Sequence, residues 1–210
     1  MIDIAGLMNT LAAQRKAYHS EADFQHAFAW EVHHQFPEST VRLERPLNVN
    51  GKLLHLDLLF RLFSSTMAVE LKYKTRKLVV ELEGEAFSLA SHSALDIGRY
   101  DFIKDIVRLE SIASNLANCE GYAVLLTNDS AYWKPRTQST VDEAFSLTEG
   151  RVLSNSMAWT EKASDGTKKY REKPLQVTGA YKLNWQDFSV ASTESYGQFR
   201  YLAVHVICRS

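Results

Sequence analysis

Cysteine and proline are scarce in this chain, whose 210 residues include two cysteines and four prolines. Cys119 and Cys208 are too few for a disulfide framework. Because both lie in or beside apolar segments, we expect them to be buried free thiols. No C-x-x-C motif or Cys/His pair with zinc-finger spacing occurs. The sequence therefore gives no support to a fold held together by disulfides or structural zinc.

Long hydrophobic runs are also missing. No stretch approaches the roughly 20 apolar residues that a helix needs to cross a bilayer. The first 16 residues lack a basic segment followed by a long apolar run, so we expect no signal peptide. The motifs G-x-x-x-x-G-K-S/T, G-x-G-x-x-G and G-x-S-x-G are absent. We therefore expect a soluble, cytoplasmic protein that makes no membrane contact and belongs to none of those nucleotide-binding or hydrolase classes.

The chain has no excess of charge of one sign, since 24 Lys and Arg face 25 Asp and Glu. This balance argues against a protein that coats nucleic acid non-specifically, although it says nothing about where the charges lie. Apolar residues make up 45% and charged residues 23%, which is typical of a globular protein. We predict one domain over residues 1–210. Its core covers residues 20–127 and a C-terminal strand over 201–208, with an irregular β-rich insertion over 135–200.

Regular secondary structure is indicated most clearly in the first half. Ser20 followed by Asp23 is typical of a helix N-cap and predicts a helix over residues 21–35. Strands are predicted over 41–47, 53–60 and 67–73, then a helix over 96–118 with Gly121 as its C-terminal cap. The apolar run 122–127 predicts a strand buried on both faces. The order helix, three strands, helix, strand predicts an α/β fold with helices packed on a sheet.

Two of the predicted strands contain charged residues that would be costly to bury. Asp57 interrupts Leu-Leu-His-Leu-Asp-Leu-Leu-Phe, and Glu70 and Lys72 share one face of the next strand. If these strands form a hairpin, Asp57 lies opposite or diagonal to Glu70, with Cβ atoms roughly 5–8 Å apart. Paired carboxylates repel unless a proton or cation lies between them, and Mg²⁺ prefers such oxygen ligands. Lys72 could then hold or deprotonate a water molecule beside the metal.

The first predicted helix carries a further acidic residue on its apolar side. Glu31 lies near the centre of the arc formed by Phe24, Phe28 and Val32. A glutamate there is sensible if this face covers the metal site. Glu21 and Glu44 are rival supporting acids, Glu21 as a first-turn acid favoured by the helix dipole and Glu44 on an exposed strand.

Together these residues resemble the PD-(D/E)XK nuclease superfamily over residues 20–127, with Glu70-Leu71-Lys72 as the E-x-K motif. The resemblance implies a restriction-endonuclease-like three-layer core of αβββαβ order, with a mixed sheet flanked by helices. It implies Mg²⁺ or Mn²⁺ bound by Asp57, Glu70 and the backbone carbonyl of Leu71, with Lys72 serving the attacking water and Glu31 as a supporting catalytic acid. It implies hydrolysis of DNA phosphodiester bonds and leaves a homodimer open. One departure is Leu56, which stands where the family has a proline.

Two alternatives remain at this stage. Asp57 could end its strand at solvent, with Glu70 and Lys72 as a surface pair, because an exposed antiparallel face tolerates such charges. The chain could also be a catalytically silent nuclease-fold module that binds nucleic acid or a protein partner. The presence of all three motif residues favours the enzyme.

Basic residues cluster after the motif and in the second half of the chain. Such runs are usually solvated surface, but here they flank the predicted site and are candidates for phosphate contacts. The acids and bases at the start of the second long helix, Asp105 and Arg108 among them, are best interpreted as exposed ion pairs. The candidate nucleic-acid contacts are Lys74, Arg76, Lys77, Arg99, Lys104, Lys168, Lys169 and Arg171.

Overall fold

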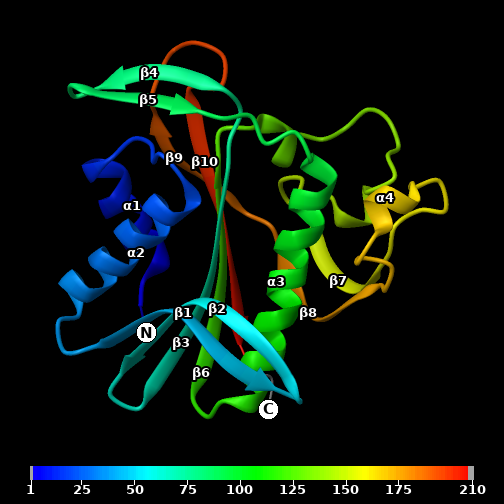
Figure 1. The fold of residues 1–210 in the computed structure, drawn as a ribbon, viewed down its shortest axis with the longest axis horizontal. Helices are drawn as coiled ribbons and strands as arrows, with labels where there is room; N and C mark the ends of the chain where they lie inside the picture. The colour runs from blue at the N-terminus through cyan, green and yellow to red at the C-terminus, as the bar shows by residue number, and fades with distance from the viewer. Residues whose placement is uncertain (1, 208–210) are drawn as a thin grey trace.

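The computed structural model describes residues 2–207, and a six-stranded mixed sheet lies at its centre (Figure 1). The strand order is β1-β2-β3-β6-β10-β9. β3 and β6 run parallel, and the other neighbouring strands run antiparallel. The strands are β1 (Thr40–Val49), β2 (Lys52–Leu62), β3 (Ser65–Lys74), β6 (Cys119–Thr127), β9 (Trp185–Val190) and β10 (Gln198–Ile207).

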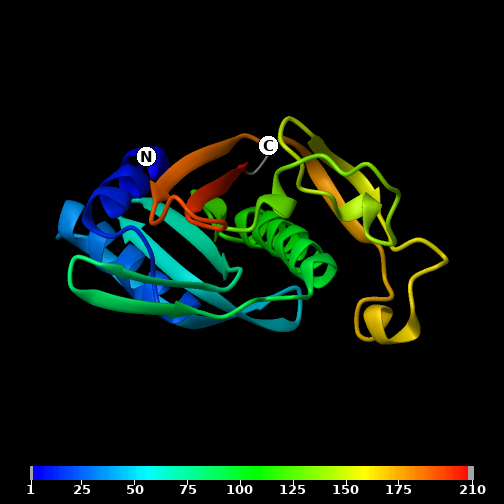
Figure 2. The ribbon, with the colours of Figure 1, turned by 90° about the horizontal axis from the view of Figure 1, so that it is seen from above.

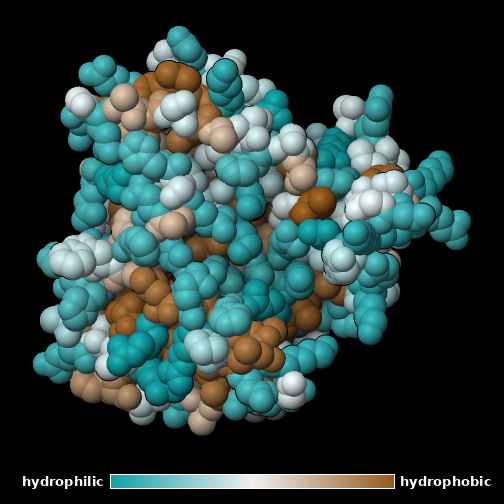
Figure 3. All heavy atoms as spheres, viewed as in Figure 1, coloured by the Kyte–Doolittle hydropathy of each residue, from teal (hydrophilic) through white to brown (hydrophobic). Residues whose placement is uncertain are grey.

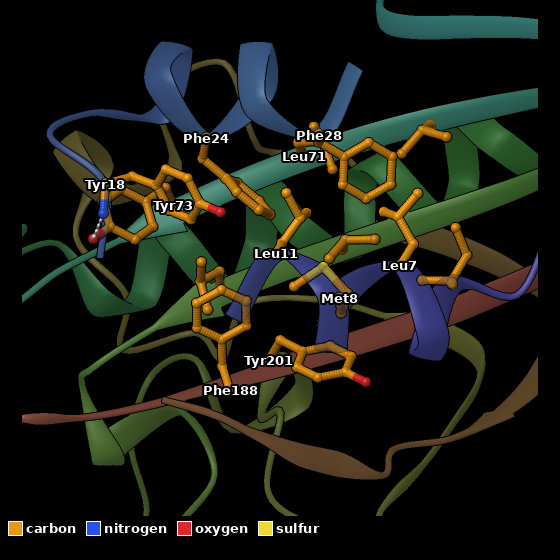
Figure 4. Close-up of a cluster of buried hydrophobic side chains, with 14 of the residues drawn as sticks. Leu7, Met8, Leu11, Tyr18, Phe24, Phe28, Leu71, Tyr73, Phe188 and Tyr201 are labelled. Atoms are coloured by element: carbon orange, nitrogen blue, oxygen red, sulfur yellow. Dashed lines mark hydrogen bonds between the residues drawn. The ribbon is translucent and has the colours of Figure 1, made fainter. Parts of the chain in front are cut away.

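Helices α1 (Ile4–Gln14) and α2 (Glu21–Gln35) cover one face of this sheet. Figure 4 shows Leu11 from α1 and Phe24 from α2 among side chains of β3, with Tyr73 close to Tyr18. The backbone N–H of Tyr18 donates to the Tyr73 hydroxyl at 3.2 Å. Burial of these large apolar side chains holds both helices against the sheet.

Helix α3 (Leu95–Asn115) covers the opposite face, so the core has three layers (Figures 1 and 2). Ile106 and Leu109 pack in the same buried cluster as Ala123 and Leu125 of β6. A separate hairpin, β7 (Val152–Met157) and β8 (Leu175–Lys182), lies beyond α3 in the second view (Figure 2). A second hairpin, β4 (Leu78–Leu82) and β5 (Glu85–Leu89), lies in the chain between β3 and α3. The shortest helical segments are η1 (Ser130–Tyr132), η2 (Glu143–Phe145) and α4 (Asp165–Lys168).

The predicted mixed α/β architecture is confirmed. Helix α2 has the predicted bounds, and Ser20 Oγ accepts from the Asp23 N–H at 3.1 Å as its N-cap. The three strands predicted in the first half correspond to β1, β2 and β3, each longer than predicted. Residues 122–127 fall within β6, where they are buried as expected. The last predicted strand corresponds to β10, although Cys208 lies outside the described residues.

The prediction that Gly121 caps the second long helix is wrong. Helix α3 ends at Asn115, and Asn118 makes the left-handed turn that follows, with φ of 52°. Gly121 lies within β6, where an added Cβ would be 3.0 Å from the Leu109 Cβ. This glycine therefore allows α3 to lie close to the sheet.

The predicted insertion over 135–200 is shorter in the structure, because β9 lies within that range and belongs to the central sheet. Helix α1 and the β4–β5 hairpin are elements that we did not predict. Cys119 is a buried free thiol, as expected.

The surface is mixed in character. The face of Figure 1 is predominantly hydrophilic, with separate apolar patches rather than one continuous apolar area (Figure 3). Across residues 2–207, no helix combines the length and apolar character needed to cross a membrane.

Candidate functional site

The site lies where β2 and β3 separate. Their ladder runs from Leu62↔Ser65 to Leu58↔Val69 and has no further pair. Beyond it, the Leu71 N–H donates to Asp57 Oδ2 at 2.7 Å. The Asp57 carboxylate thus takes the place of a backbone partner and is held next to Glu70, as the hairpin argument predicted.

Glu70 is buried, with 1% of its side chain exposed. Neither of its carboxyl oxygens has a hydrogen-bond partner within the described residues. Its ion-pair partner is Arg108, whose Nη2 lies 3.1 Å from Oε1. Burial first, and then the nearby charges of Asp105 and Asp57, raise the pKa of Glu70 to about 9. Glu70 is therefore no surface residue, which excludes the solvated cross-strand pair.

Lys72 lies among three oxygen atoms. Its Nζ donates to the Leu71 carbonyl at 3.2 Å and lies 3.1 Å from Asp105 Oδ2 and 3.9 Å from Asp57 Oδ2. Burial disfavours the charge, but the carboxylates of Asp105 and Asp57 outweigh burial and raise the pKa of Lys72 above its ordinary value. Lys72 is therefore a protonated donor at neutral pH.

Helix α3 contributes two residues to the cluster that the sequence analysis assigned to exposed ion pairs. Asp105 is 4% exposed, and Arg108 Nη1 lies 3.2 Å from its Oδ1. Burial raises the pKa of Asp105. A signal was present: Asp105 follows Phe102 by three residues and precedes Leu109 by four, so it shares their buried face. The interpretation of Asp105 as an exposed residue was therefore wrong, because this spacing places its side chain on the buried face of α3.

Glu31 does not join this cluster, and its predicted role there is corrected. It is buried as expected, but its oxygens accept from Gln14 Nε2 at 2.9 Å and Gln35 Nε2 at 2.8 Å. The helical period correctly predicted that Glu31 faces inward. It did not predict how far along α2 the residue lies from the cluster. Glu31 is ten residues from Glu21, about 15 Å along the helix.

The first turns of α2 carry the residues that approach β2 and β3. Glu21 Oε2 accepts from the Tyr73 N–H at 2.8 Å and lies 3.5 Å from Lys74 Nζ. Gln25 Nε2 donates to the Asp57 carbonyl at 3.0 Å and to Glu44 Oε1 at 3.1 Å. Glu21 therefore contacts β3 directly, and Glu44 is linked to Asp57 through the Gln25 side chain.

No protein-family model, curated protein or solved structure shows a significant match to the chain. Its chemistry therefore has to be argued from its own residues.

The cluster contains buried carboxylate oxygens, the ligand type that divalent cations prefer. Within residues 2–207 no three His, Cys, Asp or Glu side chains are already arranged around one point as metal ligands. Lys72 and Arg108 lie against the carboxylates of the cluster. Both Glu70 oxygens nevertheless lack hydrogen-bond partners among the described residues. Hard cations bind such buried carboxylate oxygens, so the residues present fit Mg²⁺ or Mn²⁺.

The candidate nucleic-acid contacts fall into two groups. Arg99 cannot reach a phosphate, because its side chain is 1% exposed and its Nη1 donates to Asp142 at 2.9 Å. This corrects its assignment, since the guanidinium is part of the core beside Tyr132. The other candidates reach the surface at least in part, and they are Lys74, Arg76, Lys77, Lys104, Lys168, Lys169 and Arg171.

Proposed function

We propose that this protein is a Mg²⁺-dependent nuclease of PD-(D/E)XK type that hydrolyses phosphodiester bonds of DNA. One observation carries the proposal: Asp57, Glu70 and Lys72 converge where β2 and β3 separate. The surrounding order α2-β1-β2-β3-α3-β6 is the αβββαβ order expected of that superfamily, with the β4–β5 hairpin inserted.

The charge of the cluster supports a bound cation. Three carboxyl groups, from Asp57, Glu70 and Asp105, face two basic groups, from Lys72 and Arg108. Without metal, the raised pKa of Glu70 keeps its proton at neutral pH and the cluster is balanced; when Glu70 is ionised the cluster has an excess of one negative charge, so a divalent cation could take the place of that proton. Such a buried imbalance is costly in a purely structural ion-pair network.

Each residue then has a distinct task. Asp57, Glu70 and the Leu71 carbonyl would hold the cation. When bound, it would stabilise the charge that develops on the phosphate oxygens and make a coordinated water more acidic. Lys72, held beside Asp57 and Asp105, would donate from its ammonium group to the attacking water or to a phosphate oxygen.

Cleavage assays test this function. Wild-type protein is incubated with single- and double-stranded DNA and RNA, with Mg²⁺, with Mn²⁺ or with EDTA. We expect metal-dependent cleavage of DNA, lost with EDTA. Asp57→Asn and Lys72→Ala each reduce the rate by about 100-fold or more, because each removes a charged group from the reacting centre.

Glu31→Gln is the matched control, since Glu31 is a buried acid outside the cluster. We expect it to cleave at the wild-type rate. Wild-type cleavage that persists at the same rate in EDTA contradicts the role of the metal. If DNA binds but no metal supports cleavage, the chain is the catalytically silent binding module instead.

A further inference from the structure

Asp105 is a buried carboxylate that the proposed reaction has not yet used. It belongs to α3, whereas Asp57, Glu70 and Lys72 belong to the β2–β3 hairpin. We propose that Asp105 is a positioning residue that holds the Lys72 ammonium group in place for catalysis. The proposal rests on the nuclease function and adds a component of the site from a different element.

The two carboxyl oxygens of Asp105 face different partners. Oδ1 accepts from Arg108 Nη1 at 3.2 Å, one helical turn further along α3. Oδ2 lies 3.1 Å from Lys72 Nζ and forms an ion pair with it. Arg108 therefore fixes one oxygen, which leaves the other directed at Lys72.

Asp57 does not fill this role equally well. Its Oδ2 is 3.9 Å from Lys72 Nζ and already accepts from the Leu71 N–H at 2.7 Å. As a metal ligand, Asp57 would share its negative charge with the cation and attract Lys72 less. Asp105 would keep its attraction for Lys72 while Asp57 binds metal.

A lysine in this role needs such a partner. Its ammonium group ends a flexible four-carbon chain, so holding it in one place has an entropic cost. Only 17% of the Lys72 side chain is exposed, and its Nζ also donates to the Leu71 carbonyl at 3.2 Å. A buried charge at 3.1 Å supplies the additional attraction.

The first test measures the mobility of Lys72 without requiring activity. Carbon-13 relaxation at the lysine Cε position is compared in the wild type, Asp105→Asn and Asp101→Asn. Asp101 is the control, because it lies one turn earlier on α3 and pairs with Arg171 at 3.7 Å. We expect Lys72 to be rigid in the wild type and in Asp101→Asn, and as mobile as the exposed Lys104 in Asp105→Asn.

Two results would overturn the proposal. One is a wild-type Lys72 as mobile as Lys104, a result that needs no variant to fold. The other is a rigid Lys72 in a folded Asp105→Asn variant.

The second test uses the cleavage reaction and a double-mutant cycle. We expect Asp105→Asn to lower kcat by about 100-fold, with KM and the Mn²⁺ dissociation constant changed less than about twofold. Combined with Lys72→Ala, it should cause little further loss, because both changes remove the same interaction. Asp105→Glu, which keeps the charge, should recover part of the rate.

The outcomes separate this inference from the nuclease proposal. The positioning role is overturned if the two rate losses multiply in the double variant. It is also overturned if Asp105→Asn reduces the Mn²⁺ affinity more than tenfold, a result that makes Asp105 a metal ligand. A wild type that cuts no nucleic acid overturns the nuclease function, and the relaxation measurement then decides whether Asp105 holds Lys72.

Discussion

At the scale of single residues, the burial of Glu70 should lower the stability of the folded chain. Glu70 is buried with neither carboxyl oxygen hydrogen-bonded within the described residues, and its pKa is raised to about 9. A group whose pKa is raised by folding contributes most below its unfolded pKa, and this contribution is lost as pH rises toward the folded pKa. The free energy of unfolding should therefore fall between about pH 4.5 and 9.

Glu70→Gln should remove this cost. We expect the metal-free variant to be more stable than the wild type by about 1–3 kcal/mol at pH 8, and by less at pH 5. Urea unfolding at the two pH values in EDTA measures the difference. Glu31→Gln is the control, because the Glu31 oxygens already accept from Gln14 and Gln35, and it should give no gain that grows with pH. A Glu70→Gln variant less stable than the wild type at pH 8 contradicts the unfavourable burial.

Divalent cations should make the wild type more stable than Glu70→Gln, which reverses the order expected without metal. A ligand that binds only the folded state raises its stability in proportion to the logarithm of ligand concentration. We expect Mg²⁺ or Mn²⁺ to raise the wild-type melting temperature, and Glu70→Gln to show less than half of that rise. The measurement is thermal unfolding over increasing metal concentration, with Glu31→Gln expected to follow the wild type. Equal rises in all three proteins would place the metal elsewhere.

The sequence was sufficient to predict that Asp57, Glu70 and Lys72 lie together, because the hairpin register and the period of a strand require only local information. Asp105 and Arg108 come from a different element, and only the docking of α3 shows which strand residues they meet. The predicted role of Glu31 was wrong for a related reason. Helical periodicity shows which way a side chain points around the helix axis, but not which residues of the sheet it meets along that axis.

At the scale of elements, a buried acid on α3 joins the β7–β8 hairpin to the core. Glu110 Oε1 accepts from the Gly179 N–H at 2.7 Å, from the Tyr181 hydroxyl at 2.9 Å and from the Thr178 N–H at 3.0 Å. Backbone donors of β8 that would lack partners are satisfied by this side chain. Glu110 thus fixes the hairpin to the same helix that carries Asp105.

Glu110→Ala should therefore loosen the hairpin. We expect a loss of about 1–3 kcal/mol in unfolding free energy, since two backbone donors and a hydroxyl would lose their acceptor. Hydrogen exchange should become faster at Thr178 and Gly179, with little change in β6. The exposed Glu81→Ala is the comparison and should change neither quantity by much. Unchanged exchange in β8 of the Glu110 variant would show that other contacts hold the hairpin.

The predicted elements were most accurate where one strong local signal was present, as at the N-cap of α2. The β4–β5 hairpin was missed because its turn uses Glu83 and Gly84, both with left-handed φ, and not a common Asn-Gly or Asp-Gly pair. Gly121 was assigned to a cap because glycine is frequent there, whereas here the packing of Leu109 explains it. Such tertiary reasons for a glycine cannot be read from local pattern.

At the scale of the whole molecule, the net charge of −1 conceals an uneven distribution. Acidic residues contribute to the buried cluster, while Lys168 and Lys169 lie at the end of α4, in the segment that joins β7 to β8. Under the nuclease proposal, this segment is a candidate contact for the phosphate backbone.

Lys168→Ala combined with Lys169→Ala should weaken DNA binding. We expect the slope of log affinity against log salt concentration to fall by about 1 for each lysine that contacts a phosphate. Fluorescence anisotropy over several salt concentrations, in Ca²⁺ or EDTA to prevent cleavage, measures the slope. Lys16→Ala is the control, because Lys16 lies in the segment between α1 and α2, the helices that cover the face of the sheet opposite α3. An unchanged slope in the double variant excludes this segment from the interface.

The separation of β2 and β3 at Asp57 also bears on the order in which the chain folds. A hairpin forms from nearby residues, so Asp57 and Glu70 can approach early, while Arg108 arrives only when α3 docks. Until then, the two carboxylates repel each other with only Lys72 near them in the sequence. Docking of α3 then brings Arg108 against Glu70 together with the carboxylate of Asp105, so the full cluster is assembled in one step. Refolding should be faster at a pH low enough to protonate the carboxyl groups of Asp57 and Glu70 in the unfolded chain. The charges of the site would then affect the rate of folding as well as the stability of the folded state.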